Sequence, residues 1–326
     1  MYNKSLNTLF MFTLVMGILL MITSKTWFSA WLGLEINLLS FLPIILLSSP
    51  RGSEGGLKYF LIQALASLII LQTSFSWFII PLPALFLMAS LSLKLGMAPL
   101  HFWLPDVTKS VNWTVNMILL TIQKVGPLYL LSSLTTEDGA LLTAVGVTSV
   151  TVGALGGMNE LDARKLMAFS SISHMGWMAI GTAISSSSWV LYLLTYIMMA
   201  LTLMGTLKKM HVFQLSQLSF KGNDSMFVMI LLLSMGGFPP FLGFAPKWAI
   251  LIESLDVSLL VSLMLVSASV VTLYYYIRAG LAMLVFSSLS QKTSFPTALP
   301  PLYHMLLYFN VFGGGMYMFM WSSLVL

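Results

Sequence analysis

Runs of about twenty apolar residues recur along the whole chain and are separated by short polar or Gly- and Pro-containing segments. A helix of about 20 apolar residues is long enough to cross the hydrocarbon layer of a membrane. Only 8% of the 326 residues are charged and 58% are hydrophobic. Soluble domains are about 25% charged and about 45–50% apolar. The sequence therefore predicts an all-α polytopic membrane protein.

Eleven apolar runs can be marked, and no connection between them is long enough to hold a soluble domain. The segment 283–302 is rich in Ser and Pro, so it is expected to be a surface linker. The predicted spans cover residues 6–23, 27–48, 57–79, 81–108, 113–133, 140–158, 163–184, 188–209, 225–254, 257–282 and 303–325.

Positive charges separate between the alternate loops of this arrangement. Lys25 falls alone on one side, whereas eleven basic residues fall on the other: Lys4, Arg51, Lys58, Lys109, Arg164, Lys165, Lys208, Lys209, Lys221, Arg278 and Lys292. The side that is rich in Lys and Arg is normally the inner one, so the amino terminus is expected there. These residues are scattered and form no dense basic patch, so no nucleic-acid partner is expected.

The sequence offers few residues for redox or metal chemistry. It has no cysteine and four histidines. It also lacks the glycine-rich, zinc-binding and haem-attachment motifs of nucleotide- and metal-binding proteins. No cofactor or metal is therefore expected in this chain, and any redox chemistry is expected to take place in a partner.

Two predicted spans are interrupted by glycine and proline. The fourth span contains Gly96, Pro99 and Pro105, and the ninth contains Gly236, Gly237, Pro239, Pro240 and Pro246. Proline removes a backbone hydrogen bond, and the carbonyls that it frees need protein or water partners inside a membrane. Interrupted spans at corresponding places of two halves indicate a transporter built from inverted repeats. A pair of kinked packing helices explains the same feature equally well.

Four ionisable residues lie inside the predicted spans: Glu35, Lys94, Lys124 and Lys247. A charge at the middle of a membrane costs at least about 2.5–3.5 kcal/mol, so such residues usually have a function. The competing interpretation is that they reach the membrane surface or form static ion pairs. Lys94 and Lys124 lie deepest, and for them this interpretation is poorest.

A lysine held away from water can bind and release a proton near neutral pH, because burial disfavours its charged form. A nearby carboxylate favours the charged form again, so movement of the carboxylate changes the proton affinity of the amine. Glu35 and Lys94 carry opposite charges in deep positions of the predicted spans, and we expect them to pair. His101 and His174 have apolar neighbours and are candidates for proton relay or for a purely structural hydrogen bond.

Several motifs in fixed order resemble a known family. They lie in residues 33–41, 57–67, 93–106, 121–127, 156–177 and 233–248. They resemble the subunit 2 family of mitochondrial NADH–ubiquinone oxidoreductase (respiratory complex I), in the shortened animal form of the antiporter-like subunits. The resemblance covers about residues 1–280.

The resemblance implies a proton-translocating core membrane subunit coupled to electron transfer from NADH to ubiquinone in other subunits. It implies two inverted five-helix repeats, 1–135 and 136–282, with broken helices, a linker at 283–302 and a C-terminal helix at 303–326. The family's relay residues fall on Glu35, Lys94, Lys124 and Lys247, and histidines of its central axis fall on His101 and His174.

The resemblance also implies a setting. FMN, iron–sulfur clusters and ubiquinone are expected in partner subunits, which include further antiporter-like subunits, and inner-membrane phospholipids are expected around the chain. The location implied is the mitochondrial inner membrane, with the amino terminus on the matrix side. Two alternatives stay open: a stand-alone cation/proton antiporter, and a membrane scaffold subunit that does not pump.

Overall fold

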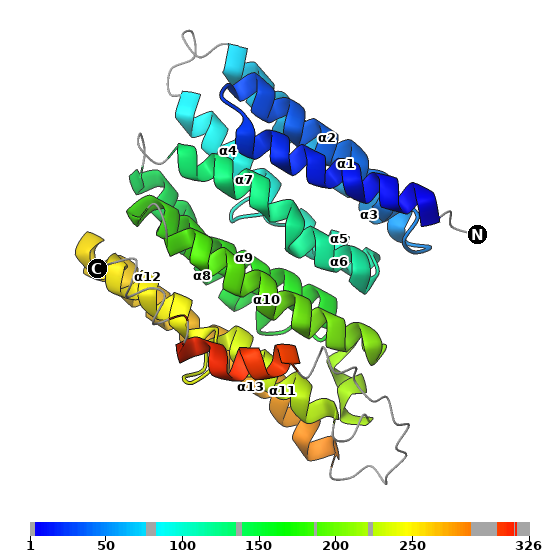
Figure 1. Ribbon diagram of the computed structural model, residues 1–326. Coiled ribbons are helices and arrows are strands. Elements are labelled where there is room, and N and C mark those ends of the chain that lie inside the picture. The colour runs from blue at the N-terminus through cyan, green and yellow to red at the C-terminus, as the bar shows by residue number, and fades with distance from the viewer. Residues whose placement is uncertain are drawn as a thin grey trace. The chain divides into compact units, whose positions relative to one another are not determined.

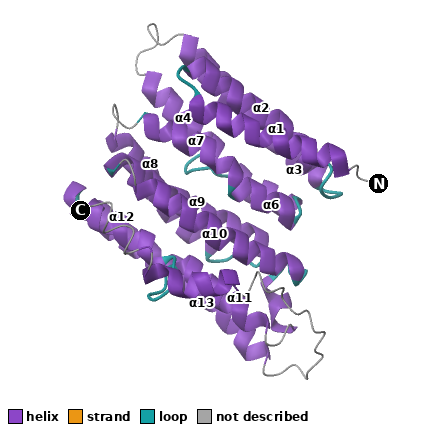
Figure 2. Ribbon diagram, in the orientation of Figure 1, coloured by secondary structure: helices purple, strands orange, loops and turns teal. Residues whose placement is uncertain are grey.

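The computed structural model describes residues 4–75, 83–134, 139–185, 188–220, 224–287, 305–315 and 317. Figure 2 shows helices throughout this part of the chain. The extended pairing recorded among these residues is an isolated antiparallel bridge between Asp162 and Gln214. The all-α prediction is therefore confirmed for the described residues.

The chain divides into two compact units, residues 1–145 and 146–326. The first unit contains α1 (Lys4–Thr23), α2 (Trp27–Leu46), α3 (Gly52–Phe75), α4 (Pro83–Leu95), α5 (Trp103–Ser110), α6 (Trp113–Leu120) and α7 (Ile122–Ser133). α1 packs against α2, α2 against α3, and α3 against both α4 and α5 (Figure 1). These neighbours are consecutive along the chain, as expected for helices joined by short connections.

The second unit contains most of α8 (Gly139–Gly157), α9 (Ala163–Ile184), α10 (Ser188–Lys209), the 3₁₀ helix η1 (Leu215–Phe220), α11 (Asp224–Gly236), α12 (Phe244–Val257), α13 (Leu259–Ser287) and the Met305–Gly315 helix. α9 lies in the core, with residues 170–182 all buried. α10 and α12 pack against α9, and α13 packs against α11 and α12.

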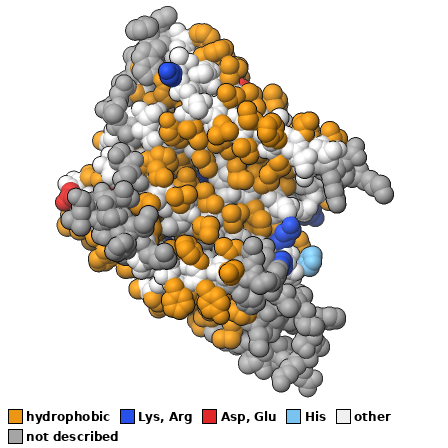
Figure 3. Space-filling model, viewed as in Figure 1, with side chains coloured by type: hydrophobic (Ala, Val, Ile, Leu, Met, Phe, Trp, Pro, Cys, Tyr) orange, Lys and Arg blue, Asp and Glu red, His pale blue; other side chains and the backbone are white. Residues whose placement is uncertain are grey.

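The outer surfaces of the helices are apolar. Figure 3 shows hydrophobic side chains over most of the surface drawn in colour. On α3, for example, Leu57, Leu61 and Leu65 recur at helical spacing and are each more than half exposed. Exposed leucines at this density indicate contact with lipid or with other membrane proteins rather than with water.

Seven described helices are long and apolar enough to cross a membrane, and three shorter apolar helices accompany them. The chain is therefore a multi-pass membrane protein. The seven are Ser5–Thr23, Trp27–Leu46, Gly52–Phe75, Trp113–Ser133, Gly139–Gly157, Ser188–Lys209 and Leu259–Leu281; the three are Pro83–Leu95, Met226–Gly236 and Met305–Gly315. The total of eleven spans stays a prediction.

Only some of the predicted domain boundaries lie within the residues that the structure describes. The division at residues 135 and 136 lies outside them, as do residues 288–302 of the predicted linker and all of 318–326. α13 continues to Ser287, so its last turn extends into the segment that was predicted to be a linker.

The two interrupted spans are broken helices of the same design. Residues 96–102 join α4 to α5, and residues 237–243 join α11 to α12, so the two links have equal length. Each link begins with a glycine in the left-handed region, Gly96 at φ +71° and Gly237 at φ +80°. Only glycine adopts this conformation without a steric cost.

Identical backbone bonds close the two helices that precede the links. Gly96 N–H donates to the Leu93 carbonyl at 3.1 Å, and Gly237 N–H donates to the Ser234 carbonyl at 3.0 Å. The next residue in each link then donates to a carbonyl five positions earlier, Met97 to Ser92 and Phe238 to Leu233. This pair of bonds is the Schellman cap, which ends a helix at a left-handed glycine.

A further irregularity divides the fifth predicted span at Thr121, between α6 and α7. The Thr121 side chain donates to the Met117 carbonyl one turn earlier, and Pro127 in the following helix has no N–H to donate. Side-chain bonding of this kind and an internal proline both disturb the helical ladder. The apolar run 113–133 alone predicts an uninterrupted helix, so the interruption is a finding of the structure.

Candidate functional site

Lys94 lies in the last turn of α4, directly before the first link, and its side chain is 7% exposed. The end of α4 is completed by neutral donors from other elements. Gln63 Nε2 of α3 donates to the Lys94 carbonyl at 3.2 Å, and Trp103 Nε1 of α5 donates to the Leu93 carbonyl at 3.0 Å. The Leu93 and Lys94 carbonyls are therefore satisfied without the Lys94 ammonium group.

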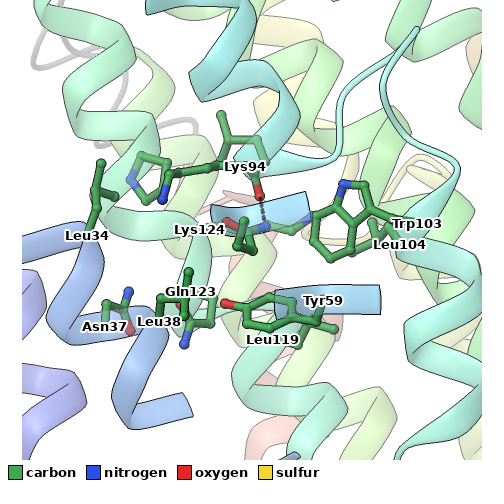
Figure 4. Close-up of a pocket in the computed structure, with 13 residues that line it drawn as sticks. Leu34, Asn37, Leu38, Tyr59, Lys94, Trp103, Leu104, Leu119, Gln123 and Lys124 are labelled. Carbon is green, nitrogen blue, oxygen red and sulfur yellow. Dashed lines mark hydrogen bonds between the residues drawn. The ribbon is translucent and has the colours of Figure 1, made fainter. Parts of the chain in front are cut away.

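Lys94 and Lys124 line the same cavity in the first unit (Figure 4). Lys124 lies in the first turn of α7, just after the irregularity at Thr121, and is 3% exposed. The cavity measures about 20 Å³ as space open to the centre of a water molecule. About 10–15 Å³ of such space is enough for one water. Two amines thus share an enclosed space of water size.

The walls of the cavity are polar as well as apolar. Tyr59, Gln63 and Trp103 line it together with Asn37 and Gln123. Asn37 Oδ1 and Gln123 Nε2 are buried and have no hydrogen-bond partner in the described part of the chain. Buried polar atoms of this kind are normally satisfied by ordered water. The cavity therefore offers a water molecule both room and partners beside the two lysines.

Glu35 lies on α2 and is half-buried; the cavity residue Leu34 directly precedes it, and the cavity residue Leu38 lies about one turn later. Its charge acts on Lys94. No ion pair within 4.0 Å joins the two among the described residues, so the expected pairing is an electrostatic influence across a gap rather than a salt bridge.

Lys247 lies in the first turn of α12, directly after the second link, and is 7% exposed. Its Nζ donates to the Gly236 carbonyl at the end of α11, at 2.9 Å. The carbonyl end of a helix carries partial negative charge, so it attracts a cation. A Cβ on Gly237 would lie 3.0 Å from Lys247 Cδ and 3.2 Å from Nζ. Glycine at 237 therefore provides both the turn and the room for the lysine.

The two histidines are placed differently. His101 lies in the first link, where its Nδ1 is 3.3 Å from the Pro99 carbonyl and its ring is tilted against that of Phe102, with the ring centroids 4.3 Å apart. His174 lies in α9 of the second unit and is 2% exposed. Its Nδ1 is 2.8 Å from the Tyr192 hydroxyl, and the Tyr196 ring lies 5.1 Å away.

Serines and tyrosines surround His174. Ser170, Ser171 and Ser173 donate to backbone carbonyls of their own helix. The Tyr275 and Tyr276 side chains are buried in the same unit. The three serines therefore bond the helix backbone.

The structure thus gathers Glu35, Lys94, Lys124 and His101 in the first unit, and Lys247 and His174 in the second. Sequence reasoning missed the neutral partners Gln63, Asn37 and Gln123. A signal existed for Gln63, because a glutamine inside an apolar span at helical spacing from Tyr59 needs a buried partner. Among the described residues, no cluster of three or more His, Cys, Asp or Glu side chains could hold a metal ion.

Comparison with known proteins gives consistent matches. A family model described as "NADH:quinone oxidoreductase/Mrp antiporter, TM" matches residues 24–80 and 70–272. The chain is 38% identical over 313 residues to NADH-ubiquinone oxidoreductase chain 2 of Dugong dugon, a match that covers 90% of this chain and 88% of that one. It is 36% identical over 301 residues to the protein of the same name from Locusta migratoria, covering 87% of each chain.

Solved structures share the fold. A chain of respiratory complex I from Thermus thermophilus matches with a TM-score of 0.83 at 23% identity, covering 98% of this chain and 79% of that chain. A chain of an archaeal membrane-bound sulfane sulfur reductase matches with a TM-score of 0.84 at 17% identity, covering 96% and 73%. The sequence matches to named relatives and to the family model together show that this chain belongs to the NADH-ubiquinone oxidoreductase chain 2 family.

Proposed function

We propose that this chain carries protons through the membrane domain of respiratory complex I by means of Glu35, Lys94, Lys124 and Lys247. The chain is a subunit of the proton-translocating NADH:ubiquinone oxidoreductase, as its family membership establishes. The observation that carries the residue assignment is the shared cavity. Two lysines that are 93% or more buried lie beside one space large enough for water.

The proposed chemistry begins with the energetics of the amines. Removing an ammonium ion from water disfavours its charged form, so the proton of a buried lysine can be lost to a nearby acceptor. A carboxylate favours the charged form of an amine that its field reaches, and we assign this role to Glu35 with respect to Lys94. A change in the position or charge of Glu35 therefore changes the proton affinity of Lys94. Water in the cavity then connects Lys94 to Lys124.

In the second unit, Lys247 is the proposed proton carrier. Its ammonium group bonds the Gly236 carbonyl, and loss of a proton weakens that bond because the helix end no longer faces a cation. His174 offers a further proton carrier, with Tyr192 as its hydrogen-bond partner.

The finer architecture is also part of the proposal. We place eleven spans in two inverted five-helix repeats, 1–135 and 136–282, followed by a C-terminal helix. Support comes from the two broken helices, which share link length, left-handed glycine and cap bonds. The segregation of positive charges supports an amino terminus on the matrix side of the mitochondrial inner membrane.

The setting follows from the family. We propose that FMN, iron–sulfur clusters and ubiquinone belong to partner subunits, and that other membrane subunits, further antiporter-like ones among them, cover part of the exposed apolar surface. A stand-alone antiporter is not favoured, because the matching relatives carry the name of the oxidoreductase chain.

The test replaces Lys124 with Met in the assembled complex and measures protons translocated per NADH oxidised. We expect Lys124→Met to lower this ratio or the turnover at least several-fold, because a neutral side chain cannot carry a proton. Lys58→Met is the matched control, since Lys58 is an exposed lysine paired with Asp106 at 2.8 Å and surface pairs contribute little. Normal ratio and normal turnover in Lys124→Met would overturn the relay. A loss of assembled complex with a normal ratio would instead support the scaffold alternative.

A further inference from the structure

The Met305–Gly315 helix packs directly on the second link. A Cβ on Gly314 would lie 3.2 Å from the Phe241 carbonyl oxygen and 3.3 Å from that of Pro240. A Cβ on Gly313 would lie 3.0 Å from Leu242 Cδ1. Two adjacent glycines therefore let the helix backbone approach the backbone of the link closely.

Asn310 makes the polar contacts between this helix and the broken element. Its carbonyl accepts from the Leu242 N–H at 3.0 Å, so it satisfies a donor of the link. An unpaired backbone N–H inside a membrane costs several kcal/mol, so this bond fixes how the link runs.

The Asn310 side chain reaches the helix on the other side of the break. Asn310 is 1% exposed. Its Oδ1 lies 3.4 Å from the Ser234 hydroxyl of α11, and its Nδ2 donates to Thr202 Oγ1 of α10 at 3.2 Å. Nδ2 also bonds the Leu306 carbonyl of its own helix at 2.9 Å. One residue therefore joins the link to α10 and α11.

These contacts lie on both sides of the Lys247 bond. Ser234 precedes Gly236, the acceptor of Lys247, by two residues, and Leu242 lies five residues before Lys247 itself. The relative position of the acceptor and the amine depends on the path of the link between them. A residue that holds Ser234 and Leu242 together therefore holds the Lys247 ammonium on the Gly236 carbonyl.

We infer that Asn310 is a positioning residue for proton transfer at Lys247, and that the Met305–Gly315 helix clamps the second break. This inference rests on the proposed function of Lys247. It gives a role to a part of the chain in which the sequence alone indicates nothing beyond one more apolar helix.

The test compares Asn310→Leu, which keeps the size and the backbone acceptor but removes the side-chain bonds, with Asn310→Asp. A protonated aspartic acid can accept from Ser234 and donate to Thr202. We expect Asn310→Leu to lower the protons translocated per NADH about twofold or more in the assembled complex, and Asn310→Asp to restore most of the loss. A purely structural contact would lower the amount of assembled complex and leave the ratio per complex unchanged.

Two further variants separate the possible failures. Lys247→Met in the same assay tests the proposed function itself: if it leaves ratio and turnover normal, Lys247 carries no protons. If Lys247→Met lowers the ratio and Asn310→Leu does not, the clamp is wrong while the relay stands. Ser262→Ala is the control, because Ser262 is a buried serine that bonds only its own helix at Leu259 among the described contacts.

A cross-link tests the contact even where Asn310→Leu prevents assembly. The chain has no cysteine of its own, so Leu242→Cys with Gly313→Cys introduces a single pair. We expect a disulfide to form in the assembled complex, because a clamp keeps these residues together throughout the cycle. Failure to form the disulfide, or loss of turnover that returns on reduction, would overturn the inference.

Discussion

Each of the two broken helices places a buried lysine at its break, but Lys94 lies before the first break and Lys247 lies after the second. In the first unit, Lys94 precedes the left-handed glycine, and neutral donors from Gln63 and Trp103 satisfy the carbonyls at the helix end. In the second unit, Lys247 follows the break and satisfies the helix end itself through Gly236. The same backbone device therefore leaves one amine facing a cavity and holds the other on a carbonyl.

The electrostatic settings differ in the same way. The charge of Glu35 acts on Lys94. Lys247 is buried, and its ammonium group bonds the Gly236 carbonyl at the end of α11. The comparison teaches that Lys94 is suited to respond to a moving charge, whereas Lys247 is suited to respond to a moving helix end.

The largest difference between the two breaks is expected in the stability of the complex when Lys94 or Lys247 is replaced with Met. Both variants lose proton transport, because neither can carry a charge. Lys247→Met also leaves the buried Gly236 carbonyl without its donor, at a cost of about 1–3 kcal/mol, whereas the α4 end keeps its donors in Lys94→Met. The thermal inactivation temperature of the assembled complex should fall further in Lys247→Met. Equal temperatures would contradict the proposed difference between the two helix ends.

A smaller difference, in proton transport, is expected when Gly96 or Gly237, the two glycines at positive φ, is replaced with Ala. Gly96→Ala and Gly237→Ala each place a side chain at positive φ, which costs about 1–2 kcal/mol. Only Gly237→Ala also presses on the lysine, whereas a Cβ at 96 meets Trp103 and Leu104 atoms at 3.3–3.4 Å. Gly237→Ala should therefore reduce proton transport per assembled complex more than Gly96→Ala does. Proton transport can be measured in membrane vesicles that oxidise NADH. A larger reduction in Gly96→Ala than in Gly237→Ala would contradict the proposed role of Gly237.

The smallest effect is expected from Gln63→Leu, which removes the donor to the Lys94 carbonyl. The loss is about 1 kcal/mol, because a neutral hydrogen bond contributes about that much and water in the cavity can replace the donor. Stability should fall slightly, with the charge on Lys94 unaffected. The thermal inactivation temperature of complexes that carry Gln63→Leu checks this. A fall in that temperature as large as the one caused by Lys247→Met would contradict the prediction that the Gln63 bond contributes little.

Much of the fold could be predicted because apolar length and Gly/Pro punctuation are local signals. The starts of α1, α2, α6, α9 and α10 lie within a few residues of the predicted spans, and both breaks fall where glycine and proline indicated. The interruption at Thr121 was missed, because Pro127 alone does not show where the ladder opens.

The candidate site was predictable in its charged members and not in its neutral ones. A lysine or glutamate inside a span is conspicuous because its burial is costly. Gln123 and Asn37 give no such signal, since their importance arises only when helices from different parts of the chain enclose the same cavity. Asn310 was missed for the same reason: its partners lie 68, 76 and 108 positions away in the sequence, at Leu242, Ser234 and Thr202.

The most direct test of the central claim is to detect a change in lysine protonation during turnover. Infrared difference spectra of the complex, recorded on adding NADH with ¹⁵N-labelled lysine, report the conversion between ammonium and amine. We predict isotope-sensitive bands that disappear in Lys124→Met and persist in Lys58→Met. Spectra that are the same for the unaltered complex and for Lys124→Met would mean that Lys124 keeps one charge state throughout the cycle, and that would contradict the account.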